Sequence, residues 1–309
     1  MIGARRQRGV ALLIALLAVA LGTIVLAMLL DSSGVALART RNIARAAQAD
    51  AYAIGLEDWA IDLLKRDWAQ DSGGRDSRGD LWSRPLPPTE VPGGRISGAM
   101  SDLNGCFNLN NLDPVTTLAE LQLQRFERLL RVLGIDPSRA QAVVDWIDAG
   151  ADAKPRGAED AAYAAADPPY RTANRWFADV SELRLVRGFD AETYAKLEPH
   201  VCALPANDSE VNVNTATGPV LMALDDLITE PVARRMQRDG GAQYSDIRAF
   251  IAALAEANVI VVELPGAGAR SYWFVARADI ELDGLPMAYA SLLERRDGRY
   301  RVISRNRAM

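Results

Sequence analysis

The stretch RRQRGVALLIALLAVALGTIVLAMLLD, residues 5–31, decides how the rest of the chain is interpreted. Three arginines and a glycine precede residues 10–30, a run with no charged side chain. As a helix, this run would be about 30 Å long, which matches the hydrocarbon thickness of a bilayer. Arginines before the run and Asp31 after it favour an N-terminus in the cytoplasm and a body on the other side of the membrane.

The composition of this segment is compatible with three fates. The three are a permanent transmembrane anchor, a signal peptide that is removed, and a segment that is cut at Gly9 and then kept. Residues 36–38, Ala-Leu-Ala, have the small-x-small pattern of a signal-peptide cleavage site. They lie beyond Asp31, after an apolar run longer than signal peptides contain. We therefore do not favour the signal peptide.

The apolar run continues into an amphipathic segment without a break. Between residues 31 and 68 there is no proline, and Tyr52, Leu56, Trp59 and Leu63 recur at helical spacing. This periodicity places the four side chains on one face of a helix. We predict one helix over residues 10–68, apolar at its start and amphipathic at its end.

Charge and cysteine content limit the possible functions. The chain has 40 acidic and 35 basic residues, and cleavage after Gly9 would remove three of the arginines. Such an acidic chain does not favour nucleic-acid binding, in which clustered Lys and Arg release counterions. The two cysteines, Cys106 and Cys202, lack the spacing of a structural zinc site. In an oxidising compartment they either form one long-range disulfide, which would contribute on the order of 4 kcal/mol, or remain separate buried thiols.

Beyond the long helix, strand signals flank a helical stretch. Residues 70–95 are rich in Gly, Pro, Ser and Asp, and we expect an exposed linker there. A strand is expected near residues 95–102. Alternating segments between residues 258 and 304 break at Asp283-Gly284 and Asp297-Gly298, as in an antiparallel meander. A strand that resumes after many helical residues indicates an α+β domain with a helical insertion.

The helical stretch contains an internal echo. Residues 129–137, LLRVLGIDP, resemble residues 183–191, LRLVRGFDA. In each, a glycine follows a helix at its C-terminal end and an aspartate then caps the next helix. Helix-hairpin-helix modules that bind DNA share this shape, but they hold a phosphate in a Gly-x-Gly turn. Here a carboxylate stands where the phosphate would bind, so we expect no nucleic-acid binding.

Acidic residues gather between residues 145 and 183. Asp148, Asp152, Glu159 and Asp160 lie in a loop with glycine and proline, and Asn174 follows. Carboxylate and amide oxygens without His or Cys are the ligand set of a hard cation such as calcium. The alternative is a solvated acidic loop whose carboxylates pair with nearby basic residues, and spacing alone favours it. Those basic residues are Lys154, Arg156, Arg171 and Arg175.

The sequence contains no convincing catalytic set. His200 is the only histidine, and no nucleophile is identified that it would activate. His200 and Cys202 are two positions apart, a spacing that does not bring their side chains together on a helix or strand face. Asp145 and Asp148 have helical spacing, and a cation or an ordinary helix end explains them better than acid–base catalysis. We expect no enzyme activity.

The combined features resemble a known family. A short basic leader that ends in Gly9, followed by Val10 and a long helix, is similar to the signal of type IV pilins and type II secretion pseudopilins. Most such subunits have Glu at the fifth mature position, where this chain has Ile14. That exception, with the segments Gly-Ala-Glu-Asp at 157–160 and Asn-Val-Asn-Thr-Ala at 212–216, resembles the K-type minor pseudopilins of type II secretion.

The resemblance implies an α+β, pilin-like fold, in which a long N-terminal helix packs on an antiparallel sheet that carries a large helical, SAM-like insertion. The expected divisions are a leader at 1–9, the long helix at 10–68 with a membrane or fibre core at 10–30, a linker with the first strands at 69–112, the helical insertion at 113–208, and the remaining helices with the C-terminal sheet at 209–309.

The resemblance also implies a function. A prepilin peptidase would cut between Gly9 and Val10 and methylate the new terminus. The protein would pass from the inner membrane, with its N-terminus cytoplasmic and its body periplasmic, to the tip of the pseudopilus. There Ile14 fits a subunit placed first, with I-type and J-type minor pseudopilins and the inner-membrane assembly platform as partners. K-type pseudopilins carry calcium, which here would be held by Asp148, Asp152, Glu159, Asp160 and Asn174.

One further hypothesis remains open at this point. The chain would then be a bitopic periplasmic enzyme whose acidic loop binds a catalytic metal. It would retain residues 1–9 and leave one coordination position of the metal open. The pseudopilin hypothesis and the enzyme hypothesis differ most directly in the fate of the leader.

Overall fold

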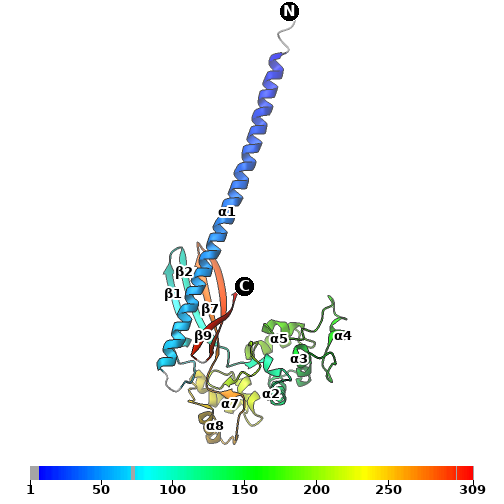
Figure 1. The fold of residues 1–309 in the computed structure, drawn as a ribbon, viewed down its shortest axis with the longest axis vertical. Coiled ribbons are helices and arrows are strands. Elements are labelled where there is room, and N and C mark those ends of the chain that lie inside the picture. Colours follow the sequence, from blue (N-terminus) through cyan, green and yellow to red (C-terminus); the bar gives the residue numbers. More distant parts are fainter. Residues whose placement is uncertain (1–6, 71–73, 297, 309) are drawn as a thin grey trace, which may run out of the picture.

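The computed structural model describes residues 7–70, 74–296 and 298–308, so most of the predicted leader, residues 1–6, lies outside the described residues. Figure 1 shows an elongated molecule in which one long helix projects from a sheet, with the shorter helices gathered at the opposite end. That helix, α1, spans Gln7–Gln70 and contains 64 residues. It extends two or three residues beyond the predicted range 10–68 at each end.

A five-stranded antiparallel sheet forms the body, in the order β1-β2-β7-β8-β9. Strands β7 and β8 are joined by a tight turn in which Asp283 and Gly284 have φ values of 48° and 76°. Such left-handed values suit an Asp-Gly hairpin turn. The sequence signal at this turn therefore predicted the hairpin correctly. The strand bounds are Leu86–Val91 for β1, Gly94–Asp102 for β2, Trp273–Leu282 for β7, Leu285–Arg296 for β8 and Arg299–Ala308 for β9.

The C-terminal half of α1 packs on one face of this sheet. Ala49, Ala53 and Leu56 meet apolar side chains of β7 and β8, and Ala60 and Leu64 continue the contact toward the end of the helix. Small alanines at this spacing let the helix approach the strands closely. Each large apolar side chain buried in such a contact contributes about 1.5–3 kcal/mol.

Polar pairs tie the same helix to the edge strand β9. Glu57 of α1 is 4% exposed, accepts a hydrogen bond from Ser291 and pairs with Arg305. Two helical turns earlier, Asp50 pairs with Arg307 at 3.0 Å. The helix is therefore fixed to the sheet by burial along its middle and by ion pairs along β9.

The insertion between β2 and β7 is helical and has one continuous core. Its apolar residues run from Phe107 to Ala267 and form a single cluster, separate from the two clusters beneath α1. Two short parallel pairs, β3 with β4 and β5 with β6, hold its ends. The bounds are β3 Phe107–Asn108, α2 Ala119–Val132, α3 Ala140–Ile147, α4 Asp160–Tyr163, α5 Ala191–Leu197, β4 Val201–Cys202, β5 Val211–Asn212, α6 Gly218–Leu224, α7 Glu230–Gln237, α8 Ile247–Glu256 and β6 Ala267–Gly268.

The internal echo has the predicted caps. Gly134 and Gly188 have φ values of 70° and 91°, the left-handed conformation that ends a helix. Asp136 accepts a hydrogen bond from Ser138 N, and Asp190 accepts one from Thr193 N. The two halves differ in two respects. The segment before Gly188, Val180–Leu185, is a 3₁₀ helix and not an α-helix, and Asp136 caps a 3₁₀ turn whereas Asp190 caps an α-helix.

Two sequence expectations are corrected by the structure. The segment predicted as a linker, residues 70–95, contains a 3₁₀ turn at Leu81–Ser83 and the edge strand β1. In addition, the predicted meander starts later than residue 258, because the five-stranded sheet resumes only at Trp273. Residues 258–272 instead run along the helical region and contribute only β6.

Candidate functional site

The N-terminal half of α1 projects from the body, and no other described segment covers it. Residues Val10 to Leu30 are exposed to solvent along the helix, and within the described residues this is the one helix long and apolar enough to cross a membrane. Its most apolar window has a mean hydropathy of 2.9. Ile14 lies on this part of the helix and is 61% exposed. An apolar surface of this extent requires a membrane or a partner to cover it.

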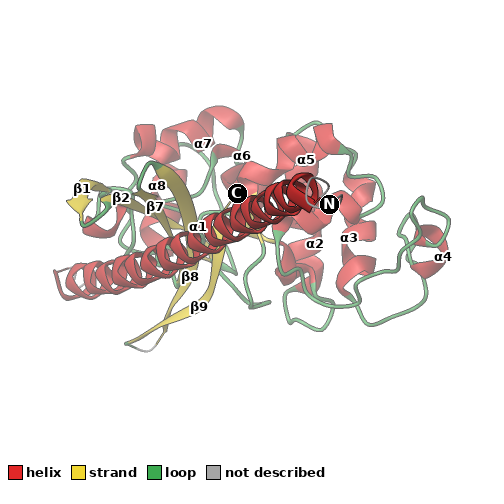
Figure 2. Ribbon diagram, turned by 90° about the horizontal axis from the view of Figure 1, so that it is seen from above, coloured by secondary structure: helices red, strands yellow, loops and turns green. Residues whose placement is uncertain are grey.

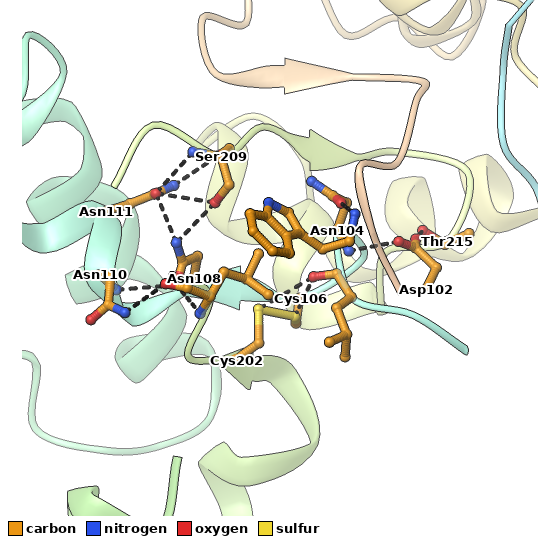
Figure 3. The surroundings of a disulfide bond; sticks show 12 residues. Asp102, Asn104, Cys106, Asn108, Asn110, Asn111, Cys202, Ser209 and Thr215 are labelled. Carbon is orange, nitrogen blue, oxygen red and sulfur yellow. Dashed lines mark hydrogen bonds between the residues drawn. A yellow bond between two sulfur atoms is a disulfide. The ribbon is translucent and has the colours of Figure 1, made fainter. Parts of the chain in front are cut away.

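A disulfide joins two segments of the helical insertion. Cys106 and Cys202, 96 residues apart in sequence, are bonded, so the structure has the disulfide of the two possibilities that the sequence left open. The bond lies beside the parallel pair of β3 and β4, as Figure 3 shows. With Cys202 in a disulfide, the chain has no thiol next to His200. His200 Nδ1 instead lies 2.8 Å from Thr217 Oγ1.

Around the disulfide, asparagine side chains form hydrogen bonds to neighbouring segments of the chain (Figure 3). The Asn108 amide donates to Asn111 Oδ1 and Ser209 Oγ at 3.1 and 3.0 Å. Asn110, which is fully buried, donates to the Phe177 and Leu204 carbonyls and accepts from Phe177 N. Because buried polar groups are costly unless paired, this network fixes the path of the chain where the insertion begins and ends.

A second asparagine set fixes the segment that returns to the sheet. Asn212 donates to the Asp76 carbonyl and to Ser271 Oγ, and Asn214 exchanges two hydrogen bonds with the backbone of Tyr244. The Asn-Val-Asn pattern therefore has a structural role, since each amide pairs with a separate segment. Sequence reasoning identified the motif but not its partners.

The acidic loop is built around the end of α3. Asp145 is fully buried in the last turn of this helix, and Asp148 follows at its C-terminus. The ammonium group of Lys154 contacts both carboxylates, with an Nζ–Oδ1 distance of 3.2 Å to Asp145. Lys154 N also donates to Asp145 Oδ2 at 3.1 Å. A Cβ at Gly157 would lie 1.8 Å from Asp145 Oδ2, so only glycine fits at that position.

Two further predicted ligands, Glu159 and Asp160, contact Thr172. Glu159 is buried, and its Oε2 accepts from Thr172 Oγ1 at 3.1 Å. Thr172 N donates to Asp160 Oδ1 at 3.0 Å. Glu159 Oε1 is buried without a hydrogen-bond partner among the described residues. Burial, with the charges of Asp145, Asp148 and Asp160, raises the pKa of the Glu159 carboxyl.

Two predicted ligands are less closely held. Asp152 is exposed in the loop, and Asn174 is exposed with its backbone N–H bonded to the Trp146 carbonyl at 3.0 Å. In Figures 1 and 2, α4 and its flanking loop lie at the outer edge of the helical region, away from the sheet. Within residues 7–70, 74–296 and 298–308, no group of three or more His, Cys, Asp and Glu side chains is already arranged to hold a metal ion.

Comparison with known proteins identifies the family. A family model described as type II secretion system protein K matches residues 105–206. A type II secretion system protein K from Pseudomonas aeruginosa is 35% identical over 320 residues, covering 98% of this chain and 93% of the relative. The chain belongs to the type II secretion system protein K family.

Other relatives agree with this assignment. A type II secretion system protein K from Pectobacterium carotovorum subsp. carotovorum is 41% identical over 232 residues, covering 71% of this chain and 70% of the relative. The fold resembles a chain in the crystal structure of the GspK-GspI-GspJ complex from the enterotoxigenic Escherichia coli type 2 secretion system. The TM-score is 0.76 at 28% identity, and the match covers 88% of this chain and 99% of that chain.

The residues that match the protein K family model are nearly the same as those enclosed by the disulfide. Its match runs from 105 to 206, and the disulfide joins residues 106 and 202. The acidic loop lies inside this match. Sequence reasoning named the pair of Asp145 and Asp148 but left Asp145 out of the predicted ligands, and it named Lys154 only as one of several basic residues that could pair with the loop carboxylates. The i, i+3 spacing of the two aspartates was the available signal for including Asp145.

Proposed function

We propose that this chain is the minor pseudopilin at the tip of the type II secretion pseudopilus, where it starts pseudopilus assembly and supports protein export across the outer membrane. The observation that carries this proposal is the match to a chain of the GspK-GspI-GspJ complex, which covers 99% of that chain. By this likeness, the I-type and J-type minor pseudopilins are its proposed partners.

The shape of the molecule supports a position at the tip. The apolar half of α1 projects from one end, and α7 and α8 lie beyond the opposite end of the sheet (Figure 1). Lateral packing of α1 against partner helices would bury apolar surface at about 25 cal/mol per Å². The helical region would then lie above the partners and leave no room for another subunit on top.

Ile14 supports the same position. A carboxylate at the fifth mature residue would neutralise the terminal amine of a neighbour, because an unpaired charge is costly in an apolar fibre core. The side chain of Ile14 has no such charge. A subunit that is placed first has no earlier subunit whose terminus it must neutralise. This difference therefore suits the first position.

Processing and location follow from the same proposal. A prepilin peptidase would cleave between Gly9 and Val10. The chain would first cross the inner membrane once, with its body in the periplasm, and the assembly platform would then extract it into the pseudopilus. The alternative of a bitopic periplasmic metal-dependent enzyme receives no support from the relatives described above.

We also propose that the acidic loop binds calcium. The donor set consists of carboxylates and one amide, and Glu159 offers a buried oxygen that no described group engages. Calcium prefers such oxygens and takes six to eight of them. Asp148, Asp152, Glu159, Asp160 and Asn174 would hold it, together with the buried Asp145. When bound, calcium would offset the repulsion among these carboxylates and make the loop rigid.

Co-expression tests the assembly proposal. The tagged full-length chain would be produced with prepilin peptidase and the I-type and J-type minor pseudopilins, then extracted in mild detergent and purified. We expect a complex that contains all three pseudopilins. Elution of the chain alone, under conditions in which the I-type and J-type proteins still bind each other, would contradict the proposal.

A further inference from the structure

Lys154 occupies the position where the acidic loop concentrates negative charge. Its ammonium group contacts Asp145, which is fully buried, and Asp148, whose side chain is 11% exposed. Both carboxylates need a cationic partner, because an unpaired charge buried at this depth costs several kcal/mol. In the protein without a metal, Lys154 supplies that partner.

The lysine neutralises only part of the site. Glu159 and Asp160, in the same loop, hydrogen-bond to Thr172 and not to Lys154. Glu159 Oε1 has no hydrogen-bond partner among the described residues, although it is buried. Among the described residues, the ammonium group of Lys154 pairs with Asp145 and Asp148 but not with Glu159 or Asp160, so a negative excess remains. A divalent cation with six or more ligands would use oxygens that the lysine does not reach.

Lys154 can leave this position without disturbing the fold. Its side chain is 33% exposed, and within the described part of the chain its ammonium group contacts only the two aspartates. Lysine has a flexible stem and a strongly hydrated charge, which is stable in water. The backbone N–H of Lys154 would keep its bond to Asp145 while the side chain turns outward.

We propose that Lys154 is a built-in counter-ion that competes with a divalent cation for Asp145 and Asp148. It stabilises the loop when no metal is bound, and it weakens calcium binding relative to the carboxylates alone. This inference rests on the proposed calcium site, and it adds a residue that sets the affinity of that site. Lys154 would keep the metal-free loop in place, and calcium would take over this role when it displaces the lysine.

Calcium binding to the full-length chain in detergent, after treatment with a chelator, tests the proposal. Isothermal titration would compare the wild type with Lys154→Gln. A charge of this kind close to a binding site changes affinity substantially, so we expect Lys154→Gln to bind calcium about tenfold more tightly or more. In chelator, the Tm of Lys154→Gln should fall below that of the wild type. Added calcium should remove this difference.

Two further variants serve as controls. Lys196→Gln removes the same charge from an exposed pair with Glu192 on α5, and it should leave both calcium affinity and Tm in chelator unchanged. Lys154→Arg keeps the positive charge and should not tighten binding. Tightening by Lys154→Arg equal to that by Lys154→Gln would overturn the proposal, because the charge would then not be the cause.

The outcomes separate this inference from the calcium proposal itself. Binding by the wild type with equal or weaker binding by Lys154→Gln would overturn the role of Lys154 and leave the calcium site intact. Binding by Lys154→Gln alone would support the competition and contradict calcium binding by the wild type. Absence of binding by both proteins at millimolar calcium would overturn both proposals.

Discussion

Where the insertion joins the body, individual asparagine side chains hydrogen-bond to segments that are distant in sequence. Asn108, Asn110 and Asn111 come from one short segment, yet their amides bond to groups as distant in sequence as residues 177–209. From sequence, this segment is identifiable only as an asparagine-rich turn. The partners could not be predicted, because each amide bonds to a segment that is remote along the chain and near only after folding.

Asn110→Asp tests the importance of this network. The change keeps the shape of the side chain, but it replaces an NH₂ donor with an oxygen that faces the Phe177 and Leu204 carbonyls. Loss of two buried hydrogen bonds with added repulsion should lower the free energy of unfolding by about 2–4 kcal/mol. Urea denaturation would measure it, with Asn306→Asp on the exposed strand β9 as a control expected to change little. Equal stability of the two variants would contradict the account.

Asp67 gives the stability a pH dependence. Burial, with the nearby charges of Asp80 and Asp76, raises the pKa of this carboxyl to about 6, although the Leu81 N–H bond opposes the shift. A folded pKa above the unfolded value means that the stabilisation is full below about pH 4 and is lost as the pH rises through about 6. Asp67→Asn should therefore reduce the loss of unfolding free energy between about pH 4 and pH 7.

Asp62→Asn, on the same helix, is the control for Asp67→Asn in the pH series. Asp62 lies on the exposed face of α1 and pairs with Arg66. Asp62→Asn should leave the wild-type pH profile unchanged. A wild-type profile that is retained in Asp67→Asn would show that Asp67 does not cause the dependence. Asp76 and Asp102 also have raised pKa values, so Asp67→Asn should flatten the profile only in part.

At the scale of elements, helical periodicity and hairpin turns were sufficient to predict α1, the position of β2 and the hairpin of β7 and β8. Strand β1 was not predicted, because Pro87 and Pro88 suggested a linker. The strand is possible because β1 lies at the edge of the sheet and pairs only with β2. Proline lacks the N–H of a central strand but is tolerated at an edge.

The ion pairs between α1 and β9 differ in burial, which allows a matched test. The side chain of Glu57 is 5% exposed in its pair with Arg305, whereas that of Asp50 is 45% exposed in its pair with Arg307. Arg305→Ala leaves a buried carboxylate unpaired and should destabilise the protein by about 3 kcal/mol. Arg307→Ala should cost less than about 1 kcal/mol. Urea denaturation that gives equal losses for both variants would contradict this assignment.

The disulfide is the strongest single constraint on the insertion. It joins residues 96 positions apart and so restricts the unfolded chain. The double variant Cys106→Ser with Cys202→Ser should lose on the order of 4 kcal/mol of stability, measured by urea denaturation. The wild type with and without a reducing agent provides the comparison. Stability that does not change on reduction would argue against this role.

At the scale of the whole molecule, the sequence predicted an α+β fold with a long N-terminal helix, an antiparallel sheet and a large helical insertion, and this is confirmed. The apolar end of α1 and the helical region lie at opposite ends of the molecule (Figure 1). In the proposed assembly, this separation lets one end enter a membrane or a fibre while the other stays in the periplasm. It supports the tip position, which is proposed from the match to a chain of the GspK-GspI-GspJ complex.

Removal or retention of residues 1–9 distinguishes a pseudopilin from an anchored or secreted periplasmic protein. The measurement is the intact mass and N-terminal sequence of the protein isolated from cells with and without prepilin peptidase. The account predicts a chain that begins at N-methylated Val10 only when the peptidase is present. An uncut chain that begins at Met1, or one that begins at Arg39, would contradict it.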